Sequence, residues 1–164
     1  MGIDLYCDKQ YFYSSYSIWN LIRTTILSAT LHYLRDELKQ YIKDNSNDQF
    51  QNNNIIKNLN EMIDFNDEYL LVNKELSINL FLSSIVNLDD LIQFDIYGIY
   101  ALCNKSDCEG FYSPGNSLDI CILLDIIKPY IKDSDIYTKL FLSENSLYKL
   151  FEESFTKKIK ITIS

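Results

Sequence analysis

The sequence predicts an α+β domain in which helices dominate and a small sheet is built from the N- and C-terminal strands. Apolar residues alternate with other residues near both ends of the chain, over 3–7 and 159–163. A long stripe of apolar residues at helical spacing follows the first of these segments. A Ser-Pro pair at 113–114 is typical of a further helix start. The 164 residues, 47% of them hydrophobic, fit a single domain, 1–164, with its own core.

The N-terminal segment alternates Ile3, Leu5 and Cys7 with other side chains, and this period of two predicts a strand. The aromatic segment 11–16 is expected to be the second strand of a hairpin or an extended lead-in to a helix. Residues 8–10 are then the turn between the two strands.

A long helix is predicted over 16–43, because apolar side chains recur there at steps of three and four: Leu27, Leu31, Leu34, Leu38 and Tyr41. We expect Ser15 or Ser17 to cap its first amides. The segment 44–54 is polar, rich in Asn and without periodicity, so we expect a mobile loop there.

The middle of the chain has weaker signals. Residues 55–63 predict a short helix. Segment 76–88 fits a strand or a helix, and the helix is favoured because no charge interrupts the segment. Segment 94–103 is apolar around Gly98, and it fits either a buried strand or a buried helix of about three turns.

The C-terminal third has sharper signals. Ser113 offers an N-cap hydroxyl, and Pro114 suits the first helical position. A further helix is expected after Ser143, with apolar residues at Leu147, Leu150, Phe151 and Phe155. The alternation over 159–163 predicts a strand that pairs with the N-terminal strand.

Charge excludes several classes of partner. The net charge is −8 and only two residues are Arg, so nucleic-acid binding is not expected, nor is binding to an anionic membrane. The longest uncharged apolar stretch, 76–88, is too short to cross a bilayer. Without a signal peptide at the N-terminus, we expect a cytoplasmic protein whose four cysteines are free thiols. The abundance of Asn, Ile and Tyr is attributed to an AT-rich genome.

Two short motifs stand out. Residues 15–20 are S-Y-S-I-W-N, with Arg23 one turn further on, and residues 106–110 are S-D-C-E-G. With these motifs the chain resembles a family of small uncharacterised proteins of bacteria and large DNA viruses, marked by S-Y-S-x-[WY]-N and S-D-C-[DE]-G. The resemblance implies that both segments are signature features, and it implies no activity, cofactor or fold.

The residue types in these motifs do not favour catalysis. Cys108 lies between Asp107 and Glu109, and the two carboxylates disfavour a thiolate. His32 is the single His, and its place in the long helix favours a partly buried structural group over a general base. No phosphate-binding glycine loop occurs, so no nucleotide cofactor is expected by that route.

No metal is expected either. The cysteines lack zinc-site spacing. An EF-hand alignment through Asp107 places Lys105 and Asn116 where the first and last ligands should be, which disfavours Ca²⁺. We expect Asp107 and Glu109 to accept backbone amides in a turn, with Gly110 at positive φ.

Three functional hypotheses remain. The first is a non-enzymatic protein-binding or regulatory module, whose acidic charge favours a basic protein partner. The second is a small enzyme or ligand-binding protein with a pocket between 15–23 and 104–113, lined by Tyr16, Trp19, Asn20, Arg23, Ser106, Asp107, Cys108 and Glu109. The third is a structural component. Tyr16 and Trp19 also fit an ordinary role in the core.

Overall fold

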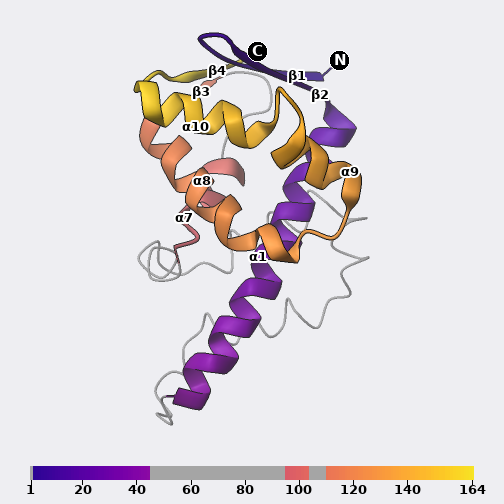
Figure 1. The fold of residues 1–164 in the computed structure, drawn as a ribbon, viewed down its shortest axis with the longest axis vertical. Coiled ribbons are helices and arrows are strands. Elements are labelled where there is room, and N and C mark those ends of the chain that lie inside the picture. The colour runs from indigo at the N-terminus through magenta and orange to yellow at the C-terminus, as the bar shows by residue number, and fades with distance from the viewer. Residues whose placement is uncertain (1, 45–94, 104–109) are drawn as a thin grey trace.

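The computed structural model describes residues 2–44, 95–103 and 110–164. The predicted loop beyond residue 44 and the predicted helices at 55–63 and 76–88 lie outside the described residues. The described part is rich in helix and has one antiparallel sheet formed by strands near both termini, so the predicted α+β class is confirmed (Figure 1).

Within the described residues the sheet has four strands in the order β2-β1-β4-β3. Strands β1 (Gly2–Cys7) and β2 (Gln10–Ser15) form a hairpin, which decides the open question at 11–16 in favour of a second strand, although Gln10 belongs to β2 and not to the turn. Its turn places Asp8 at a φ of 49°, a conformation that Asp tolerates better than most residues. Strand β4 (Ile161–Ile163) pairs antiparallel with β1, which confirms that the two ends of the chain share one sheet. Strand β3 (Gly110–Tyr112) completes the sheet beside β4.

Helix α1 (Tyr16–Asp44) begins where the sequence predicts and ends one residue later. The amide of Ile18 donates to Ser15 Oγ at 3.4 Å, so Ser15 is the predicted cap. Leu27, Leu31 and Leu34 are all buried, which confirms this part of the apolar stripe.

Helix α7 (Tyr97–Cys103) decides the open question at 94–103 in favour of a helix. It packs against α8 (Pro114–Ile127) so closely that a Cβ at Gly98 would lie 2.3 Å from the Asp119 carbonyl oxygen. Helix α8 starts with the predicted cap, since Ser113 Oγ accepts the Asn116 amide at 3.1 Å.

Three short segments link α8 to the last helix: η1 (Lys128–Tyr130), α9 (Ser134–Tyr137) and η2 (Thr138–Leu142). Helix α10 (Leu147–Lys157) is the helix predicted after Ser143, and Ser146 is its N-cap. The chain then turns through Lys158, and β4 starts two residues later than the apolar alternation begins.

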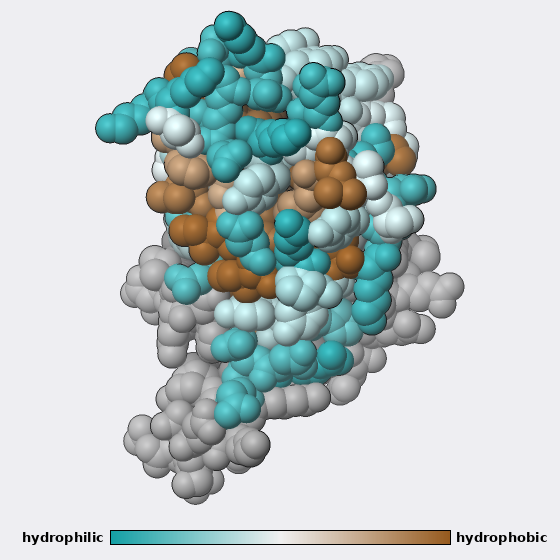
Figure 2. Space-filling model, in the orientation of Figure 1, coloured by the Kyte–Doolittle hydropathy of each residue, from teal (hydrophilic) through white to brown (hydrophobic). Residues whose placement is uncertain are grey.

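The sheet lies across one end of the helices, and the two termini lie near each other on it (Figure 1). Its inner face and the helices share one core, in which Trp19, Tyr112 and Phe151 are the largest fully buried side chains of the described residues. Figure 2 shows hydrophobic residues among polar ones over the helical layer below the sheet, and residues of intermediate to hydrophilic character at the sheet end. Thus one face of the sheet is buried against the helices, and the other face is open to solvent.

Candidate functional site

The N-terminal motif is placed on the first turns of α1. Trp19 is 1% exposed, and its ring centroid lies 6.3 Å from that of Phe12 on β2. The Arg23 guanidinium lies 5.9 Å from the Trp19 ring, and its Nη2 donates to Asn20 Oδ1 at 2.8 Å. Tyr16 is half-buried. The structure therefore brings Trp19, Asn20 and Arg23 together and places Trp19 in the core.

The second motif is described only at Gly110. Its φ of 138° confirms the predicted positive φ, and it begins β3. Ser106, Asp107, Cys108 and Glu109 lie outside the described residues. A pocket between the two motifs therefore stays a prediction, and the two cavities described below are lined by other side chains.

The outer face of the sheet carries a group of exposed aromatic side chains that the sequence reasoning did not single out. Tyr6 is 45% exposed, Tyr11 37%, Tyr13 54% and Phe111 50%. We call this surface the aromatic face. The alternation that predicts the strands also predicts this face. Tyr6 is out of phase with the buried Ile3, Leu5 and Cys7, so its side chain must point to the opposite side of the sheet.

The strand register aligns these side chains. Tyr6 pairs with Tyr11 and with Thr162, and Thr162 pairs with Phe111, so one row crosses all four strands. The rings of Tyr6 and Tyr11 lie 4.9 Å apart. Tyr13 stands in the next row, opposite Asp4.

Asp4 and Lys160 are charged groups that lie beside aromatic side chains of this face. The Tyr11 hydroxyl donates to Asp4 Oδ1 at 2.8 Å, and this hydrogen bond raises the pKa of Tyr11 to about 12. Lys160 Nζ lies 5.4 Å from the centre of the Phe111 ring, within cation–π range. Tyr11 is consequently a neutral side chain at physiological pH, and the face is amphipathic and aromatic.

A cavity of about 410 Å³ opens between α1 and the segment 130–133, which runs from the end of η1 to the start of α9. Its polar lining includes Thr25, His32, Arg35, Asp36, Tyr130 and Lys132. We call it the α1 groove. His32 is half-buried, as predicted, but it lies at this groove rather than within the apolar core.

A smaller cavity of about 310 Å³ lies against α7 and α8 and is lined by Asp95, Tyr97, Asp119 and Ile122. Burial raises the pKa of Asp119. Within 2–44, 95–103 and 110–164, no group of three or more His, Cys, Asp or Glu side chains is arranged to hold a metal ion.

The cysteines of the described segments are all buried and outside any disulfide: Cys7, Cys103 and Cys121. Burial, followed by the charges of Asp125 and Glu152, raises the pKa of Cys121 to about 12. Burial also raises the pKa of Cys7. A thiol that keeps its proton is a poor nucleophile, so neither Cys7 nor Cys121 suits covalent catalysis.

Comparison of the chain with protein-family models, with curated proteins and with solved structures gives no match. The family resemblance indicated by the two motifs therefore stays a prediction. Among the helices that the structure describes, none combines the length and the apolar character needed to span a bilayer.

Proposed function

We propose that the protein is a non-enzymatic binding module that recognises another protein through the aromatic face. One observation carries the proposal: Tyr6, Tyr11 and Phe111 form a row across the sheet and remain 37–50% exposed. Exposed apolar patches on a folded protein are typical of interaction sites. Aromatic rings are enriched at the energetic centres of interfaces, since they bury a large area at little cost in rotamer entropy.

The partner is inferred from charge. A second copy of this chain would also carry a net charge of −8, so long-range repulsion opposes self-association through this face. Stacking on exposed sheet aromatics is also used by proteins that bind single-stranded nucleic acid, but those proteins add a positively charged groove. With 23 acidic and 15 basic residues, this chain instead attracts a protein surface that is apolar at its centre and bordered by Lys and Arg.

The test is a selection from a displayed peptide library, followed by calorimetric titration of the selected peptides. The variant combines Tyr6→Ser, Tyr13→Ser and Phe111→Ser on the aromatic face. The matched control is Leu142→Ser, which removes an apolar side chain that is 64% exposed in η2, outside the sheet. Circular dichroism checks that both variants fold. We expect them to fold, because a cross-strand side-chain pair contributes only about 0.2–1 kcal/mol to stability.

We expect the selected peptides to be rich in basic and aromatic or aliphatic residues. Their Kd should rise at least about tenfold, or about 1.4 kcal/mol, in the triple variant and stay unchanged in Leu142→Ser. Equal affinity in the wild type and the triple variant would overturn the proposal. So would sedimentation data showing a wild-type dimer that the triple variant abolishes, because the face would then bind a second copy.

A further inference from the structure

The α1 groove is a second surface, formed by residues that the aromatic face does not use. Leu21, Thr25, Ala29 and His32 line it from α1 at steps of three and four, which is one face of the helix. The opposite wall is the segment 130–133. At about 410 Å³ the groove is within the usual size of small-molecule sites, roughly 300–1,000 Å³.

Asp36 and Asp133, the acidic side chains among the described residues that line the groove, already have internal partners. Asp36 Oδ2 accepts the Tyr130 hydroxyl at 3.2 Å, which links the two walls, and Asp36 Oδ1 lies 3.5 Å from Arg35 Nε. Asp133 Oδ1 accepts two backbone amides at 2.9 Å at the start of α9. These contacts reduce the capacity of the carboxylates to bind a cationic ligand.

The wall at Tyr130 is held in place by a second contact. Its ring packs edge-on against Tyr33 of α1, with centroids 6.2 Å apart. Burial, followed by the hydrogen bond to Asp36, raises the pKa of Tyr130. Tyr130 therefore remains a neutral donor, and its contacts with Asp36 and Tyr33 hold this wall against α1.

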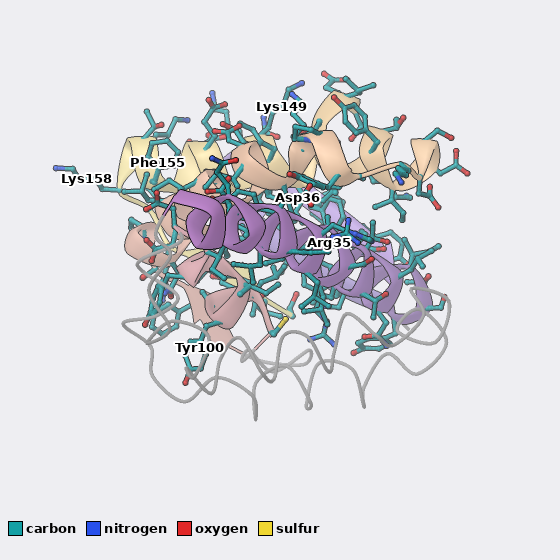
Figure 3. All side chains as sticks on the ribbon, turned by 90° about the horizontal axis from the view of Figure 1, so that it is seen from below. Arg35, Asp36, Tyr100, Lys149, Phe155 and Lys158 are labelled. Atoms are coloured by element: carbon teal, nitrogen blue, oxygen red, sulfur yellow. The ribbon has the colours of Figure 1, made fainter. Side chains whose placement is uncertain are left out.

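Arg35 and Lys132 have donors that no other residue of the described segments occupies. Lys132 makes no ion pair with another residue of the described segments, and its ammonium has three N–H donors. Arg35 contacts Asp36 through Nε, and its terminal amino groups make no hydrogen bond to the rest of the described chain. Figure 3 shows Arg35 and Asp36 on α1, with Asp36 at the border between α1 and the C-terminal helices.

We infer that the α1 groove binds a small anion, whose carboxylate or phosphate group is held by Arg35 and Lys132 and whose apolar body lies on Leu21 and Ala29. Guanidinium and ammonium donors are the usual partners of both anionic groups. The hydroxyl of Thr25 supplies a further polar contact in the groove. This inference goes beyond the proposed protein recognition, and it stands on different residues.

The test titrates the ¹⁵N-labelled full chain with phenyl phosphate, phenylacetate and, as the probe of opposite charge, benzylamine. Concentrations reach about 10 mM, which is tenfold above a Kd of about 1 mM. The variants are Lys132→Gln and Arg35→Gln. The matched control is Lys9→Gln, which removes the same charge from the exposed turn between β1 and β2.

We expect saturable amide shifts confined to 21–36 and 130–136 with phenyl phosphate, with phenylacetate or with both. If phenyl phosphate binds more tightly than phenylacetate, the groove prefers a phosphate group; the reverse order indicates a carboxylate. The Kd should rise at least about tenfold in Lys132→Gln and in Arg35→Gln, and stay unchanged in Lys9→Gln. Three results would overturn the inference: no saturation with either anion, tighter binding of benzylamine, or equal weakening by Lys9→Gln, which indicates an adventitious ion only.

Discussion

Ser117 on α8 and Ser154 on α10 are joined by a hydrogen bond of 2.8 Å between their hydroxyl oxygens, and both side chains are fully buried. Ser154 Oγ also donates to the Ile159 carbonyl oxygen at 2.6 Å, just before β4. The pair thus links two helices and the approach to the last strand inside the core, where each polar group needs a partner.

Replacing Ser154 with Ala should lower the free energy of unfolding by about 1–3 kcal/mol, because the Ile159 carbonyl and the Ser117 hydroxyl lose a buried partner. Equilibrium unfolding in urea measures the change. The control Ser134→Ala lies at the exposed start of α9 and should stay within about 0.5 kcal/mol of the wild type. Equal losses in both variants would contradict a special role for the buried pair.

Two glycine substitutions should change the free energy of unfolding in opposite directions. Gly98→Ala places a Cβ 2.3 Å from the Asp119 carbonyl oxygen, so α7 and α8 must separate, at a cost of about 1–3 kcal/mol. Gly115→Ala meets its nearest neighbour, Ser113 Oγ, at an ordinary 3.7 Å and should stabilise α8 by about 0.5–1 kcal/mol. Thermal unfolding of the two variants distinguishes them, and equal melting temperatures would contradict the close approach of α7 and α8.

The cap of α8 should be sensitive to the chemistry at Ser113. Ser113→Ala removes the acceptor of the Asn116 amide and should destabilise the protein by about 1 kcal/mol. Ser113→Asp restores an acceptor at the same place and should recover most of that loss. Denaturant midpoints of the two variants test this expectation, and it fails if the Asp variant is as unstable as the Ala variant.

Stability should decrease above about pH 9 because of Cys121. The pKa of its thiol is 9.0 in an ordinary environment and about 12 in the folded protein, where burial is the main cause. Between these two values the unfolded chain has released the proton and the folded chain has kept it. Unfolding therefore becomes easier as the pH rises, by up to about 1.4 kcal/mol per pH unit for one group.

Urea unfolding near pH 8 and near pH 10.5 measures this slope in the wild type and in Cys121→Ala. The variant loses the contribution of the thiol but keeps those of the tyrosines, so its stability should fall less steeply with pH. Identical slopes in the two proteins would show that the thiol is not the group responsible.

The sequence by itself determined the elements whose signals are local. The alternation at 3–7, the apolar stripe at Leu27, Leu31 and Leu34, and the Ser113 cap each depend on residues within a few turns or one strand. Such signals can be recognised in the sequence because side chains that face the same side of a helix or strand recur with the period of its backbone. The C-terminal alternation likewise predicted β4, although its first apolar residue lies outside the strand.

The tertiary structure decided what depends on distant residues. An apolar run such as 97–103 has no period that separates a buried helix from a buried strand, and three residues are too few for β3 to show one. The aromatic face needs the register of four strands, and the α1 groove needs Tyr130 to reach Asp36, which is 94 positions earlier in the chain. These surfaces exist only after packing, because the pairing of distant side chains is selected by burial of the shared core and not by local propensity.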